Sequence, residues 1–176
     1  MNMRHHGQGG YLLIEAMIAM GILVTGVLSV FVLMSQSIKL NKMISTQYTA
    51  NYLAAEGIEI TKNILDNNNL TNSLNWNGGG FDAERCYELD YTTQSLSAAT
   101  IVSCPDGGAT PLSSDGTFYR YGGGVNTIPF TRTIHITPIM SGSATQIGVI
   151  VDSTVRWPAS FGRNSITLED TFYAWH

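Results

Sequence analysis

One carboxylate, Glu15, begins the most apolar stretch of the sequence. It lies four residues after Tyr11, which directly follows Gly10. An acid at membrane depth costs on the order of 2.5–3.5 kcal/mol on insertion scales, so such a residue needs a partner that neutralises its charge. If the chain were cut after Gly10, the new α-amine of Tyr11 would be such a partner, in the same chain or in a neighbouring one. This spacing therefore suggests an ion pair that depends on processing.

The sequence contains two cysteines, Cys86 and Cys104, and no CxxC pair. A zinc ribbon or an iron–sulfur cluster therefore has no ligand set to build on. If this part of the chain lies in an oxidising compartment, a disulfide is permitted. Closing a loop of this size would stabilise the fold by ~3 kcal/mol in the chain-entropy model. We expect a disulfide between Cys86 and Cys104, with two free thiols as the alternative.

No further residues have the spacing of a catalytic or cofactor site. The sequence has no Ser/His/Asp motif, no GxxxxGK[ST] loop and no metal-spaced His/Glu group. His135 stands alone in a predicted strand, so we expect an exposed sheet residue rather than a base. His5 and His6 offer too few ligands for a metal and are expected to belong to a disordered tail. These observations predict a protein that is not an enzyme and that needs no cofactor and no metal.

Charge is scarce and unevenly distributed along the 176 residues. Charged residues make up 12% of the chain and the net charge is −4, without the basic excess of a nucleic-acid binder. None lies within residues 16–38, a run of 23 positions. As a helix this run is ~35 Å long, enough to cross a bilayer core of ~30 Å. A buried core helix or a cleaved signal are the alternatives, but the length and the lack of a small-residue cleavage site favour a retained transmembrane helix.

The string Gly10-Tyr11-Leu12-Leu13-Ile14-Glu15 before this helix resembles the N-terminal signal of type IV pilins and pseudopilins. The resemblance implies that a prepilin peptidase removes residues 1–10 by cutting after Gly10 and that the new first residue, Tyr11, is N-methylated. It also implies that Glu15 pairs with the N-terminal amine of a neighbouring subunit during filament assembly. Val32 stands where major pilins commonly have a proline, which fits a minor pilin or a pseudopilin better.

The remaining pattern predicts one helix followed by a β-rich head. Residues 11–66 contain no proline and show a good helical periodicity, so the helix is predicted to extend over all of them. An Asn- and Gly-rich loop follows it. Residues 67–176 form the head, an antiparallel sheet of about four to six strands laid over the helix, with strands at 130–136, 147–157 and 165–175. The segments 51–59 and 155–168 extend the pilin resemblance over most of the chain. The fold class is therefore α+β and pilin-like.

Two further patterns have two interpretations each. Gly21, Thr25 and Ser29 recur every four residues, and this stripe either packs against other membrane helices or arises by coincidence in a span rich in small residues. Several aromatic residues of the head either line a binding face or, more ordinarily, pack against the helix. They are Trp76, Tyr87, Tyr91, Tyr119 and Tyr121.

The resemblance leads to a minor pilin of a type IV pilus as the expected function. Its partners would be the prepilin peptidase, other pilin subunits, the assembly machinery and the membrane. The chain would first cross the inner membrane once, with the head outside, and then join an extracellular or periplasmic filament. Lys39 and Lys42 argue against this orientation by positive-inside counting. The alternatives are a pseudopilin of a type II secretion or DNA-uptake system and, in another class, a single-pass membrane-anchored adhesin or receptor.

Overall fold

A computed structural model describes residues 9–71, 75–104, 110–123, 126–142, 145–158 and 163–174. The chain divides into two compact units, Met1–Thr46 and Gln47–His176. Of the expected leader, only Gly9 and Gly10 fall within the described residues.

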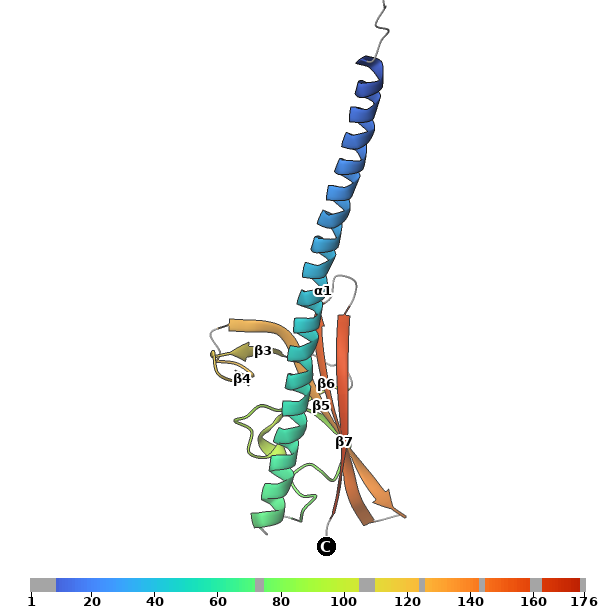
Figure 1. Cartoon of the computed structure of the whole chain (residues 1–176). Helices are drawn as coiled ribbons and strands as arrows, with labels where there is room; N and C mark the ends of the chain where they lie inside the picture. Colours follow the sequence, from blue (N-terminus) through green and yellow to red (C-terminus); the bar gives the residue numbers. More distant parts are fainter. Residues whose placement is uncertain are drawn as a thin grey trace, which may run out of the picture. The chain divides into compact units, whose positions relative to one another are not determined.

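A single helix, α1 (Gly9–Thr71), contributes to both units (Figure 1). It continues past the predicted end at residue 66. Asparagine is a weak helix former, but Asn68 is buried and its side-chain amide donates to the carbonyl of Gly78 at 3.1 Å. The hydroxyl of Thr71 also donates to the carbonyl of Asn67 at 2.8 Å. These contacts keep the Asn-rich segment helical, so the loop begins after Thr71.

The first unit contains the apolar part of α1. The most apolar window of this helix has a mean hydropathy of 2.5, and none of that window is buried. By length and composition this one helix could anchor the chain in a membrane.

The second unit combines the rest of α1 with one seven-stranded sheet, in which every strand pair is antiparallel. The long strand β5 is its centre: β1 and β3 pair with it at different positions, β2 and β4 extend these two, and β6 and β7 follow in turn. The strands are β1 (Arg85–Glu88), β2 (Thr100–Val102), β3 (Pro111–Ser114), β4 (Tyr119–Arg120), β5 (Asn126–Ser141), β6 (Thr145–Pro158) and β7 (Arg163–Tyr173), with a 3-10 turn η1 (Leu96–Ala98) before β2. The α+β, pilin-like fold class is confirmed, with one strand more than the largest number expected.

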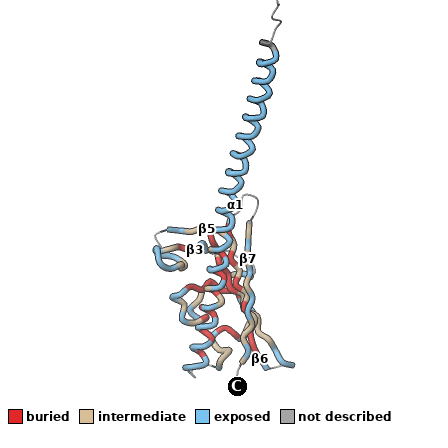
Figure 2. Tube along the Cα trace, in the orientation of Figure 1, coloured by how far each residue is buried: buried red, intermediate tan, exposed pale blue. Residues whose placement is uncertain are grey.

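The core of the second unit lies between α1 and one face of the sheet, where the buried residues gather in Figure 2. Alternate residues of β5 and β6 point to this face because side chains alternate along a strand. The buried residues form two clusters. The first contains Ile60, Ile64, Leu65, Phe81, Tyr87, Leu89, Leu96, Ile134, Ile136, Val149 and Val151. The second contains Ala50, Leu53, Ala54, Leu112, Phe130, Val155 and Trp157.

Gly57 is the point of α1 at which the helix approaches the sheet most tightly among the described glycines of the helix. A Cβ atom at this position would lie 2.5 Å from Cδ1 of Ile134 and closer still to the hydroxyl oxygen of Ser153. A larger residue would therefore push the helix away from β5 and β6.

Candidate functional site

Tyr11 and Glu15 lie one turn apart on α1, on the same side of the helix. Both are exposed, and the Tyr11 residue is 78% accessible. Among the residues that the structure describes, no ion pair involves Glu15. Gly10 directly precedes Tyr11 in the first turn of the helix.

The apolar side chains that follow Glu15 are also uncovered. Leu12, Ile18 and Phe31 are 65%, 58% and 68% exposed, and the other large apolar residues from Leu13 to Ile38 are 51–73% exposed. An exposed apolar surface of this extent marks a membrane or protein interaction site rather than a surface in contact with water.

The stripe of small residues satisfies its own hydroxyl groups. The hydroxyl of Thr25 donates to the carbonyl of Gly21 at 3.0 Å, and that of Ser29 donates to the carbonyl of Thr25 at 2.7 Å. A side chain that bonds within its own helix leaves no unpaired donor toward lipid or a neighbouring helix. The stripe is therefore compatible with both environments.

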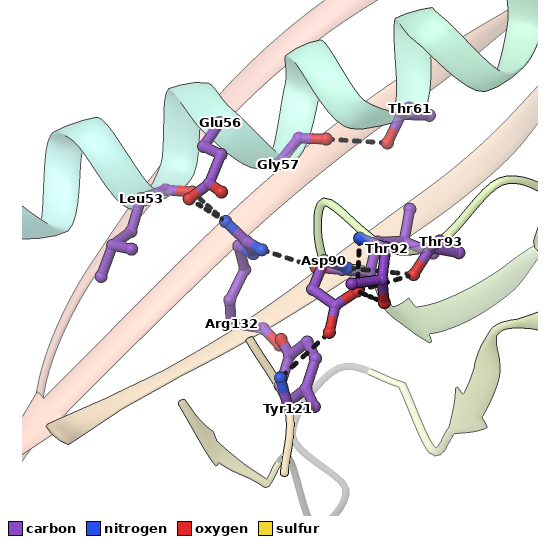
Figure 3. A network of polar contacts seen from close by, with 10 residues as sticks. Leu53, Glu56, Gly57, Thr61, Asp90, Thr92, Thr93, Tyr121 and Arg132 are labelled. Carbon is purple, nitrogen blue, oxygen red and sulfur yellow. Dashed lines mark hydrogen bonds and ion pairs between the residues drawn. The ribbon is translucent and has the colours of Figure 1, made fainter. Parts of the chain in front are cut away.

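Arg132 joins the helix to the sheet from inside the second unit (Figure 3). Its side chain is fully buried, and Nη1 donates to the carbonyl of Leu53 and to the Glu56 carboxylate, both at 2.9 Å. Nη2 donates to the carbonyl of Leu89 at 2.6 Å. One guanidinium thus connects α1, β5 and the loop after β1. The sequence contained a signal for it, because Arg132 alternates in phase with the apolar residues Phe130 and Ile134.

Asp90 organises the loop beside this arginine. Its carboxylate accepts hydrogen bonds from the backbone N–H and hydroxyl of Thr92, the hydroxyl of Thr93 and the backbone N–H of Tyr121. Burial acts to raise the pKa of Asp90, but these hydrogen bonds outweigh it and lower the pKa below its usual value. The Tyr121 hydroxyl donates to the carbonyl of Arg132 at 2.7 Å, and burial raises its pKa.

The structure joins Cys86 and Cys104 by a disulfide, with their Cα atoms 5.5 Å apart. His135 lies in β5 and is partly exposed, beside Glu84 and Asp152. Its place in the sheet agrees with the prediction, and the structure adds two acidic neighbours that the sequence did not reveal. The two bonded sulfurs and a ring nitrogen of His135 also lie within 4.8 Å of one another.

The aromatic residues of the head mostly pack into its core. Tyr87 is buried and Trp76 packs against the first core cluster, while Tyr119 and Tyr121 pack against the second. Tyr91 is 42% exposed, and its ring lies 4.8 Å from that of Phe118. Packing therefore accounts for four of the five aromatic residues considered.

Comparison of the chain with protein-family models, with curated proteins and with solved structures gave no significant match. The function is therefore inferred from the residues of the N-terminal segment.

Proposed function

We propose that the protein is a pilin-like subunit, a minor pilin of a type IV pilus, that assembles through its N-terminal helix. The observation that carries this proposal is the string from Gly10 to Glu15 directly before the uncharged run 16–38, on a helix whose apolar side chains are exposed. Lipid would cover these side chains before assembly, and the helices of neighbouring subunits would cover them afterwards.

In this function a prepilin peptidase cuts after Gly10, and Tyr11 becomes the N-methylated first residue. Glu15 then pairs with the amine of a neighbouring subunit as that subunit leaves the membrane. The pair compensates the cost of holding a carboxylate in an apolar filament core. The chain crosses the inner membrane once with the head outside, and it ends in an extracellular or periplasmic filament.

Glu15→Ala tests the role of the carboxylate in filament assembly. We expect the variant to be processed and membrane-bound with its disulfide-linked head folded, and to be lost from sheared filaments by more than about tenfold, since removing one partner of a buried ion pair costs 3–5 kcal/mol. Immunoblotting of filament and membrane fractions measures this loss. Glu59→Ala removes an exposed glutamate from the part of α1 that belongs to the second unit, and it is the matched control.

Intact-mass measurement of the membrane-extracted protein tests processing separately. Cleavage after Gly10 predicts a chain that begins at Tyr11, with or without one added methyl group. A chain that keeps residues 1–10 in cells with active prepilin peptidase contradicts the proposal. Absence of the wild-type chain from sheared filaments, with membrane binding that Glu15→Ala leaves unchanged, favours a single-pass anchored adhesin or receptor instead. A pseudopilin of a secretion or DNA-uptake system shares this processing, and deletion of the pilus or of the secretion machinery separates the two.

A further inference from the structure

The sheet places a row of metal-binding residue types on the face away from its core clusters, where Cys86 is buried, His135 is partly exposed and Cys104 is exposed. Cys86 in β1 lies opposite His135 in β5, and His135 lies opposite Asp152 in β6. Directly opposite residues of antiparallel strands project to the same side of the sheet. The neighbours of His135, Ile134 and Ile136, belong to the core cluster, so the row faces away from it. Cys104 joins the row through the disulfide.

Three potential ligand atoms of this row lie close together, although the two sulfurs are bonded to each other in the disulfide. The two sulfurs and a ring nitrogen of His135 lie within 4.8 Å of one another. A tetrahedral zinc ion with bonds of ~2.0–2.3 Å separates its ligand atoms by about 3.3–3.8 Å. Reduction of the disulfide would let the two sulfurs separate to this spacing while they stay beside His135. Two thiolates and an imidazole are ligands that favour zinc over magnesium or calcium.

The carboxylates beside His135 supply the support that a metal-binding histidine needs. Nε2 lies 3.1 Å from Oε1 of Glu84, and Nδ1 lies 3.5 Å from Oδ2 of Asp152. Metal-binding histidines almost always donate their second ring N–H to a carboxylate or carbonyl, which fixes the ring orientation. Whichever nitrogen of His135 binds the ion, the other nitrogen keeps a carboxylate partner.

We propose that the head, with Cys86 and Cys104 reduced, binds one thiophilic divalent cation through these two cysteines and His135. Water or one of the two carboxylates completes the fourth position. The disulfide-linked head does not bind this ion, because a disulfide sulfur has no thiolate to offer. Metal binding and disulfide formation are then mutually exclusive, because both use the same two sulfurs. This inference does not depend on the proposed pilin function.

The two reactions balance in atoms and charge. When Zn²⁺ binds, the two thiols release two protons and form two zinc–sulfur bonds. A disulfide oxidant then takes two electrons from the bound thiolates, so that the Cys86–Cys104 bond forms, both zinc–sulfur bonds break, and the oxidant takes up two protons to become two thiols. The Zn²⁺ ion is released unchanged.

The first experiment compares the reduced and the oxidised full chain in detergent micelles, after removal of reductant, by titration with Zn²⁺ against a chromophoric chelator. We expect one tight site per chain in the reduced form, which the oxidised form lacks. Any binding by His5 and His6 is present in both forms and so is subtracted. Equal binding by the two forms overturns the proposal.

The second experiment uses His135→Gln, which keeps both cysteines and changes a partly exposed side chain. Loss of a supporting partner already weakens metal binding 10–100-fold, so loss of the ligand itself should weaken binding of Zn²⁺ by more than about tenfold. Thr167→Gln, at an exposed position of β7, introduces the same residue and should bind as wild type does. If His135→Gln binds Zn²⁺ as tightly as wild type does, His135 is not a ligand and the proposal is contradicted. Binding to the free thiols of an unfolded chain would give this result.

Discussion

Arg132 is the residue whose loss the head should tolerate least. It is a fully buried cation that contacts two carbonyl groups and Glu56, whose side chain is 31% exposed. Replacing either a buried arginine or one of its partners by an apolar group is costly, because the replacement leaves the remaining polar group without a partner.

Arg132→Leu should lower the free energy of unfolding by about 3 kcal/mol, because the carbonyl of Leu89 loses its donor and Glu56 loses its cation. Glu56→Gln should cost about 1 kcal/mol or less, since this side chain reaches solvent and its amide oxygen still accepts from the guanidinium. Urea unfolding followed by tryptophan fluorescence measures both variants. Equal losses would show that Arg132 contributes only through its pair with Glu56.

Asp90 makes the stability of the head depend on acid. Its pKa in the folded chain is lower than the unfolded value of about 3.9, so its stabilisation is complete above that value and is lost as the pH falls through the folded pKa. Asp90→Asn should therefore reduce the difference in urea midpoint between pH 7 and pH 3. Asp66→Asn, at an exposed position of α1, is the control and should keep the wild-type difference.

At the scale of the element, α1 serves two different environments with one continuous helix. Its glycines show the contrast, because a Cβ atom at Gly57 would meet Ile134 and Ser153, whereas one at Gly21 or Gly26 would meet nothing within 4 Å. The fold of the single chain thus requires a small residue at Gly57, but it gives no reason for one at Gly21 or Gly26.

Gly57→Ala should destabilise the head by about 1–3 kcal/mol through overpacking. Gly21→Ala should leave the unfolding of the head unchanged, because Gly21 lies in the first unit and an alanine Cβ has open space there. If neighbouring helices pack against this position in a filament, the same variant should reduce assembly. Urea unfolding and the yield of sheared filaments measure the two effects independently, and a loss of head stability in Gly21→Ala would contradict this division.

The sequence predicted the elements with strong periodicity and missed those held by tertiary contacts. The long helix and the strands near 130–136, 147–157 and 165–175 correspond to α1, β5, β6 and β7. The short strands β1–β4 have two to four residues each, too few to show an alternation. They exist because β1 and β3 pair with β5, while β2 and β4 pair with β1 and β3. The Arg132 network was missed because two of its partners are backbone carbonyls, which leave no mark in a sequence, and because Glu56 lies 76 residues away along the chain.

For the whole molecule, the division at Thr46 predicts that the two units can be separated. A chain that starts at Gln47 keeps every residue of both core clusters and should fold as a water-soluble protein with its disulfide. The full chain should float with lipid vesicles in a density gradient. The shortened chain should not, because it lacks the exposed apolar part of the helix. Flotation of the shorter chain would place a membrane-binding surface on the head.

The disulfide also changes what proteolysis can do to the head. Cys86 and Cys104 enclose the loop that carries Asp90 and η1, so a protease that cuts the backbone anywhere between them leaves the two fragments covalently joined. Such a nicked chain would migrate as one band without reductant and as two bands with it. The head could therefore be cut in this loop and still remain attached to its helix.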